Sequence, residues 1–259
     1  MAECINDQFR AHLATRSLTP LMGLADALTA LDAAATLPPA HIVRHAPVTA
    51  PGTTTLIDEA AAKQRLRSLG VPVPDGRVVT ADGVAPAADA IGFPVTLKAL
   101  GLAHKSEAGA VKVGIRDHTA LAAALAAMPD TGAGFLVEST VTDIVAEVLV
   151  TVRRDAPIGW LVTLGHGGVT TELWSDVTHL LAPVTADNVR TALDRLRSAP
   201  LLHGFRGRPA ADIDALADLV VRLTDAVVGT DVVEVELNPV LVGTTGATAV
   251  DALLIVEQH

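Results

Sequence analysis

The 259-residue chain has one cysteine, Cys4, and very few aromatic residues. A single cysteine excludes an intramolecular disulfide and any zinc site built on several cysteines. Two tryptophans, four phenylalanines and no tyrosine cannot supply the base stacking on which many single-strand nucleic-acid proteins depend. These absences favour a protein whose partners are small molecules or other proteins.

An excess of positive charge is also absent. The formal net charge of −10 at pH 7 argues against a protein that binds a long phosphate backbone. A single nucleotide is not excluded, because its site needs only a few local cations and a metal ion. No apolar run approaches the roughly 20 residues that span a bilayer, and the first residues do not read as a signal peptide. We therefore expect a cytoplasmic protein.

Turn signals and apolar periodicity predict an α/β fold in three parts. We expect residues 1–50 to form a helical leader, residues 51–130 a small lobe and residues 131–259 a larger lobe. In the small lobe, Asp58 is the expected N-cap of a helix that ends at Gly70. A cleft between two lobes is a favoured place for a ligand.

Residues 135–140 and 144–154 alternate in a way that predicts two neighbouring antiparallel strands. Glu138 and Glu147 lie in these segments, near the expected hinge between the lobes. Either carboxylate is a candidate for binding a ribose or an adenine edge. The alternative is that each simply caps the end of a strand.

Lys98 ends a strand whose other residues are apolar, and a loop of small residues follows it. Such a loop lets the backbone approach a ligand closely, and its successive N–H groups can bind an anion. We therefore predict a phosphate-binding segment that includes Lys98, Lys105, Ser106 and Gly109. The alternative for Lys98 is a lysine that extends its ammonium group to the surface at the end of a strand.

His104 lies in the same loop, between the two lysines. A neutral imidazole can accept a phosphoryl group, and an imidazolium can stabilise the charge of one in transfer. The alternative is an exposed histidine without a function. The neighbouring lysines and glycines favour the catalytic interpretation.

Oxygen-bearing side chains alternate near the C-terminal end of the chain. Glu234, Glu236 and Asn238 occupy every second position of an expected strand and so share one face, while Asp251 interrupts the next apolar run. Carboxylate and amide oxygens are ligands that suit Mg²⁺, which completes its coordination with phosphate and water. The alternative is an ordinary solvated face of a strand.

Two further segments are candidates for contacting phosphate. Gly167 and Gly168 form a glycine loop after an expected strand, and Arg206 lies in the segment HGFRG. A guanidinium in a glycine-rich segment can bind an anion. A plain loop arginine is the alternative for Arg206.

Together these segments resemble the ATP-grasp domain of the NDP-forming acyl-CoA synthetases. That family includes ADP-forming acetyl-CoA synthetase and, more distantly, succinyl-CoA synthetase. The resemblance covers about residues 56–256, with the motifs in the order of the family. The motifs are EAAAKQRLRSLGVPVP, IGFPVTLKAL, HKSEAGAVKVGI, GHGGVTTELWSDVTHLLAPV, LLHGFRGRP, EVELNP and AVDALL.

The resemblance implies a two-lobed ATP-grasp fold in which ATP lies between the lobes. Its γ-phosphoryl group passes through phosphohistidine to an acyl phosphate, which CoA then captures. By resemblance, Lys98 contacts the nucleotide phosphates and His104 is a relay histidine. Glu236 steadies a phosphohistidine, while Asn238 and Asp251 bind Mg²⁺. Phosphoryl transfer of this kind depends chiefly on positioning and charge neutralisation.

The chain departs from the family pattern at Ala110, where a second glycine is usual, and at His166, where an apolar residue is usual. It also shows no CoA-binding segment. The resemblance therefore implies a β-type component that uses ATP and Mg²⁺ and needs a CoA-binding α-type partner in a hetero-oligomer. Two alternatives are a non-catalytic nucleotide-sensing module and an ATP-dependent carboxylate–amine ligase.

Overall fold

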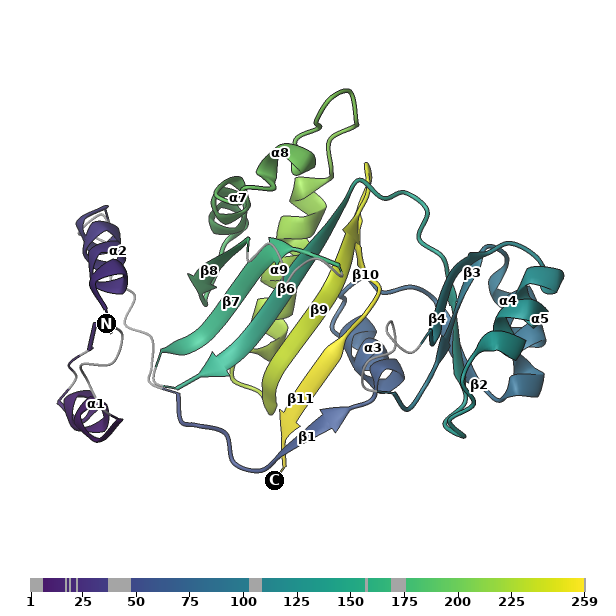
Figure 1. Ribbon diagram of the computed structural model, residues 1–259, viewed down its shortest axis with the longest axis horizontal. Coiled ribbons are helices and arrows are strands. Elements are labelled where there is room, and N and C mark those ends of the chain that lie inside the picture. Colours follow the sequence, from purple (N-terminus) through teal and green to yellow (C-terminus); the bar gives the residue numbers. More distant parts are fainter. Residues whose placement is uncertain are drawn as a thin grey trace. The chain divides into compact units, whose positions relative to one another are not determined.

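The computed structural model describes residues 7–16, 18, 20–21, 23–36, 48–102, 109–156, 158–168 and 176–258 of the protein (Figure 1). The chain divides into two units, residues 1–45 and residues 46–259. The first unit contains helices α1 (Asp7–Ala14) and α2 (Leu24–Thr36). In the part of the chain that the structure describes, no helix is both long and apolar enough to cross a membrane.

The second unit combines two antiparallel sheets with several helices, which confirms the expected mixture of helix and strand. Its elements are β1 (Thr54–Ile57), α3 (Glu59–Ser68), β2 (Gly76–Val79), η1 (Ala81–Gly83), α4 (Val84–Ile91), β3 (Val95–Ala99), β4 (Val111–Ile115), α5 (His118–Ala127), β5 (Phe135–Ser139), β6 (Ala146–Asp155), β7 (Gly159–His166), β8 (Val177–Leu181), α7 (Ala186–Asp194), α8 (Ala199–Leu202), α9 (Ile213–Val227), β9 (Val232–Val242), β10 (Ala247–Ala249) and β11 (Leu253–Glu257).

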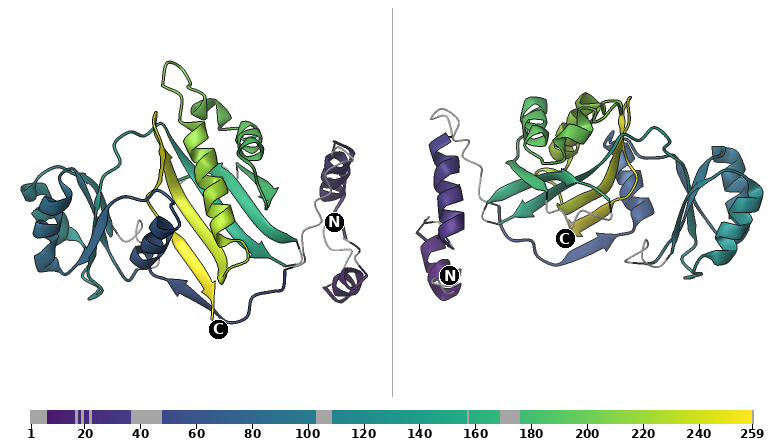
Figure 2. Two further views of the ribbon diagram at one scale, coloured as in Figure 1. Left: turned by 180° about the vertical axis from the view of Figure 1, so that it is seen from behind. Right: turned by 45° about the horizontal axis from the view of Figure 1, so that its top comes forward.

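The larger sheet has the strand order β1-β11-β9-β6-β7-β8, and the short strand β10 also pairs with β9. Helix α9 lies across one face of this sheet, and α7 packs against α9 on the same side (Figure 2). Apolar residues of α9 recur every three or four positions and are fully buried, as at Leu216, Val220 and Leu223. One face of the sheet is thereby covered, and polar side chains of β9 lie on the other.

The smaller sheet has the order β2-β5-β3-β4 and carries α4 and α5 on one face (Figure 1). Strand β5 pairs with β2 and β3, whereas β6 pairs with β7 and β9 in the larger sheet. The expectation that these two strands are neighbours is therefore wrong. Alternation identifies a strand and its buried face, but it does not identify the partner strand.

Helix α3 connects β1 of the larger sheet to β2 of the smaller one. Its start follows from Asp58, the N-cap, whose carboxylate accepts a hydrogen bond from the backbone N–H of Ala61 at 3.0 Å. Its end follows from Gly70, which adopts a φ of 76° that suits glycine best. One acidic and one basic residue of this short helix, Glu59 and Lys63, are buried.

Candidate functional site

Oxygen-bearing side chains gather on the face of β9 opposite α9. Glu234, Glu236 and Asn238 are partly buried there and alternate with the buried Val235 and Leu237. Asp251 lies in the link between β10 and β11, and both of those strands pair with β9. We call Glu234, Glu236, Asn238 and Asp251 the oxygen cluster. The two segments are therefore adjacent in the fold.

The charges of the oxygen cluster repel one another. The pKa of Glu236 is raised above the ordinary glutamate value, first by burial and then by the carboxylates of Glu234 and Asp251. A hydrogen bond with the Asn238 side chain acts in the opposite direction. A bound cation would relieve this repulsion, so the electrostatics of the cluster favour a cation there.

The donor set also fits magnesium better than a softer metal. Among the described residues, no three His, Cys, Asp or Glu side chains form a complete metal site by themselves. Mg²⁺ does not require one, because it is commonly held by one or two protein oxygens together with phosphate and water. Asn238 and Asp251, with Glu236 beside them, are the residues that would hold it.

Four charged side chains form a closed ring of ion pairs beside the oxygen cluster. Lys63 Nζ lies 2.6 Å from Glu138 Oε1 and 2.9 Å from Glu59 Oε1. Lys98 Nζ lies 2.6 Å from Glu59 Oε1 and 3.3 Å from Glu138 Oε2. We call these four residues the ion-pair ring. Lysines and glutamates alternate around it, and α3, β3 and β5 supply its members.

The ion-pair ring is almost completely removed from solvent. Relative exposures are 5% for Glu59, 4% for Lys63, 5% for Lys98 and 2% for Glu138. Charged groups at this depth require partners, since burying an unpaired charge is very costly. Two ammonium groups and two carboxylates make the ring neutral overall.

The two lysines of the ring differ in their electrostatic surroundings. Burial alone lowers the pKa of Lys98, but the carboxylates of Glu59, Glu138 and Asp251 outweigh burial, so the pKa is raised. Burial and the neighbouring Lys98 ammonium lower the pKa of Lys63 despite its two glutamate partners. The carboxylate of Asp251, in the oxygen cluster, accounts for part of this difference.

One backbone carbonyl connects the ring to the oxygen cluster. The oxygen of Val250 accepts a hydrogen bond from Lys63 Nζ and another from Lys98 Nζ, each at 2.6 Å. Val250 directly precedes Asp251. An ammonium group suited to phosphate therefore lies next to oxygens suited to a divalent cation, as the predicted roles of Lys98 and Asp251 require.

The glycine loop after β7 also reaches the oxygen cluster. The backbone N–H of Gly168 donates to Asn238 Oδ1 at 2.9 Å, and that of Gly167 donates to the carbonyl of Glu147 at 2.9 Å. A Cβ atom at Gly167 would lie 2.7 Å from the carbonyl carbon of Val148, so only glycine fits there. The loop therefore orients Asn238.

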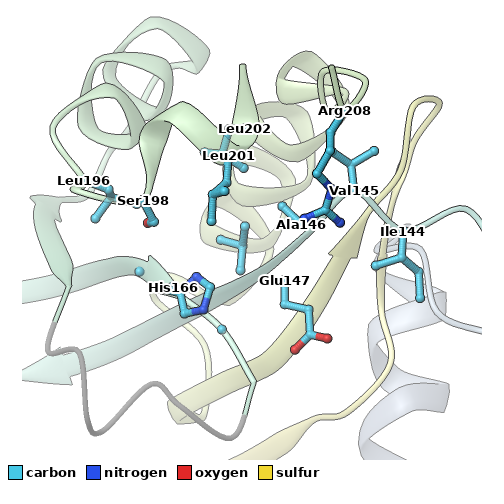
Figure 3. A pocket seen from close by; sticks show the side chains of 13 residues that line it. Ile144, Val145, Ala146, Glu147, His166, Leu196, Ser198, Leu201, Leu202 and Arg208 are labelled. Atoms are coloured by element: carbon cyan, nitrogen blue, oxygen red, sulfur yellow. The ribbon is translucent and has the colours of Figure 1, made fainter. Parts of the chain in front are cut away.

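Glu147 and Glu138 have different surroundings. Glu147 is exposed and lines a cavity of about 300 Å³ together with His166 and Arg208 (Figure 3). Both carboxylate oxygens of Glu138 accept from Lys63, at 2.6 and 2.8 Å. A ribose or adenine contact by either glutamate stays a prediction.

The structure describes Gly109 and Arg206 but not the other remaining candidate residues. His104, Lys105 and Ser106 lie outside the described residues, so their predicted roles stay predictions. Gly109 has a φ of 67°, and a Cβ there would meet nothing within 4 Å. Arg206 is exposed and its guanidinium lies 5.2 Å from the centroid of the Phe205 ring. Its role as an anion clamp also stays a prediction.

Sequence reasoning missed Glu59 and Lys63 as members of the site. Their spacing of four residues on a helix usually marks a solvent-exposed ion pair. The partners that bury them, Glu138 and the carbonyl of Val250, are 75 and 187 residues from Lys63 in the sequence. No local pattern reports such distant contacts, although two charges among the alanines of α3 were a weak signal.

The chain is similar to known ATP-grasp proteins. The sequence profile of the ATP-grasp domain family matches residues 49–256. The chain is 31% identical over 209 residues to the β subunit of acetate–CoA ligase (ADP-forming) I from Pyrococcus furiosus, covering 76% of this chain and 90% of that one. It is 34% identical over 230 residues to trans-feruloyl-CoA synthase from an unidentified prokaryote, covering 82% of this chain but only 32% of that protein.

Solved structures show the same fold. Acetyl-coenzyme A synthetase 1 from Candidatus Korarchaeum cryptofilum, in complex with coenzyme A and Ca-AMPCP, matches with a TM-score of 0.71 and 29% identity, covering 78% of this chain and 93% of that one. A second structure of that enzyme contains Mg-AMPPCP, and its phosphohistidine segment points towards the nucleotide-binding site. It matches with a TM-score of 0.66 and 30% identity, covering 77% of this chain and 92% of that one.

Proposed function

The chain belongs to the ATP-grasp family, as the ATP-grasp component of ADP-forming acyl-CoA ligases, and from this premise we propose that it binds Mg²⁺–ATP and transfers the γ-phosphoryl group. The complete reaction is ATP + carboxylic acid + CoA → ADP + phosphate + acyl-CoA. One observation carries the proposal. The ammonium group of Lys98 and the oxygen cluster meet at Val250 and Asp251, where a triphosphate and its metal ion require opposite charges side by side.

The residues have distinct roles in this proposal. Lys98 donates to the phosphate oxygens, while Asn238 and Asp251 hold Mg²⁺, which neutralises phosphate charge when it is bound. Gly109 allows backbone N–H groups to approach the phosphates. Gly167 and Gly168, whose own N–H groups bond the Glu147 carbonyl and Asn238, leave room for the phosphates because they carry no side chain. Further contacts come from Lys105, Ser106 and Arg206, and from Glu138 and Glu147 at the nucleoside.

The relay step transfers the γ-phosphoryl group of ATP to His104. A neutral imidazole nitrogen of His104 attacks phosphorus, the bond from phosphorus to the bridging oxygen breaks, and ADP leaves with the electron pair. Glu236 steadies the phosphohistidine so formed. The phosphoryl group then passes through a second histidine, outside this chain, to the substrate carboxylate, and CoA displaces phosphate from the acyl phosphate.

A partner is required for the second half of the reaction. The Pyrococcus relative is a β subunit of similar length, which supports a hetero-oligomer with a CoA-binding α-type subunit. The feruloyl-CoA synthase is about three times longer than the segment it shares with this chain, which supports the same component joined to further domains. We place the protein in the cytoplasm, where ATP and CoA are available.

Phosphoprotein labelling tests the proposal. The chain is incubated with Mg²⁺ and γ-labelled ATP, with and without the α subunit of the Pyrococcus enzyme, and acid-labile label on the chain is measured. We expect label in the wild type and in His118→Asn, an exposed histidine paired with Asp89, but not in His104→Asn. Label that persists in His104→Asn contradicts the relay role. ATP binding without label supports the nucleotide-sensing alternative, and absence of ATP binding overturns the proposal.

A further inference from the structure

The two ring lysines use their N–H donors differently. An ammonium group has three donors. Lys63 donates to both carboxylate oxygens of Glu138 and to the carbonyl of Val250, and it also forms an ion pair with Glu59. Lys98 donates to Glu59 and to the carbonyl of Val250, whereas its contact with Glu138, at 3.3 Å, is an ion pair without a hydrogen bond. Lys98 can therefore bind a phosphate oxygen by giving up this ion pair.

The geometry identifies the partner that Lys98 releases most easily. Its contact with Glu138 is the longest of the three, 3.3 Å against 2.6 Å for Glu59 and 2.6 Å for Val250. Glu138 does not lose its neutralisation when this contact breaks, because Lys63 binds both of its oxygens. The exchange of partners therefore leaves no buried carboxylate unpaired.

Removing Lys63 would change this balance. Among the four ring residues, Glu138 would then keep Lys98 as its one cationic partner, and the ring would carry a net charge of −1. Glu138 would then hold Lys98 more firmly, and the excess negative charge would lie next to the phosphates of the nucleotide. Both effects oppose nucleotide binding, and the low exposure of the ring limits screening by solvent.

We propose that Lys63 is a positioning residue for the nucleotide site: it is the fixed counter-ion of Glu138 and Glu59 that allows Lys98 to exchange a carboxylate for a phosphate. The inference rests on the proposed function, in which Lys98 contacts the nucleotide phosphates. Lys63 also donates to the carbonyl that precedes Asp251, so it supports the metal-binding side of the site as well.

Calorimetric binding of Mg²⁺ with a non-hydrolysable ATP analogue to the full chain tests this role. We expect Lys63→Met to bind about tenfold or more weakly than the wild type at about pH 8. The ratio of the two dissociation constants should shrink towards about pH 5.5, since the unpaired carboxylate of the variant takes up a proton. Lys112→Met, an exposed lysine of β4, is the matched control and should bind as the wild type does.

Glu59→Gln separates charge balance from packing. The double variant Glu59→Gln/Lys63→Met has a neutral ring again, so we expect it to bind more tightly than Lys63→Met but about threefold or more weakly than Glu59→Gln alone. If Lys63→Met fails to fold, this last comparison carries the test. Equal nucleotide affinities of Glu59→Gln/Lys63→Met and Glu59→Gln overturn the proposal.

The outcomes are distinguishable. Wild-type affinity in Lys63→Met overturns the positioning role and leaves the proposed function intact. Weakened binding that neither varies with pH nor improves in the double variant means that Lys63 acts through packing alone, and this also overturns it. A wild type that binds no nucleotide overturns the proposed function together with the inference.

Discussion

The ion-pair ring and the oxygen cluster are neighbours, yet they balance their charges in opposite ways. The ring contains two charges of each sign, almost entirely buried and in mutual contact. The oxygen cluster contains three carboxylates, is partly open to solvent, and holds the pKa of Glu236 above its ordinary value. The ring is balanced without a ligand, whereas the cluster favours an added cation.

This difference assigns different tasks to the two regions. A balanced, buried ring pairs its charges before nucleotide arrives and keeps Lys98 in place. An unbalanced, accessible cluster gains stability when a metal ion binds. Substitutions in the ring should therefore cost the most folding free energy, and substitutions in the cluster should act mainly on metal binding and on the dependence of stability on pH.

Lys98→Met gives the largest expected effect on stability. We expect the free energy of unfolding to fall by about 3–5 kcal/mol, because two buried carboxylates are left with one ammonium group between them. Urea unfolding followed by circular dichroism measures the change. Lys112→Met, which removes the same charge from an exposed position, should change stability by less than about 0.5 kcal/mol. Equal losses in the two variants contradict a special role for the ring.

Gly167→Ala tests the loop that orients Asn238. The added methyl group would lie 2.7 Å from the carbonyl carbon of Val148, and relieving such a contact should cost about 1–3 kcal/mol of folding free energy. Thermal unfolding measures it. At Gly23 an added Cβ meets nothing within 4 Å, so Gly23→Ala is the control. An unchanged melting temperature in Gly167→Ala contradicts the tight fit.

Asn238→Ala tests the metal side of the oxygen cluster. Removing one oxygen ligand should raise the Mg²⁺ concentration needed for half-maximal nucleotide binding about tenfold, with a smaller effect on folding than Lys98→Met. Titration with Mg²⁺ at constant nucleotide concentration measures the shift, and EDTA provides the metal-free baseline. Binding that does not depend on Mg²⁺ in either protein contradicts a metal site here.

Glu236→Gln has the smallest expected effect, and its sign depends on pH. A carboxyl group with a raised folded-state pKa favours folding below its unfolded value of 4.5, and this contribution is lost as the pH rises through the folded value. We therefore expect the variant to be more stable than the wild type at neutral pH, by at most about 1 kcal/mol after solvent screening. The difference should vanish below the unfolded pKa. Thermal unfolding across this range checks it, and a stability loss at neutral pH contradicts the repulsion.

Several elements were predictable because their signals are local. The cap at Asp58 and the glycine at position 70 identify α3, and alternation identifies the shared face of Glu234, Glu236 and Asn238. The partner of each strand was harder to predict from the sequence. Residues 135–140 and 144–154 were correctly predicted as strands but belong to different sheets, since pairing depends on the whole chain.

The amino-acid sequence by itself identified α3, several of the strands, the family and the row of oxygen ligands, since each depends on residues close together or on motifs in order. Only the tertiary structure decided that Glu59 and Lys63 belong to the site and that Val250 joins the ring to the cluster. The physical reason is burial. An ion pair on a helix becomes part of a functional site only when distant strands exclude water from it and supply its remaining partners.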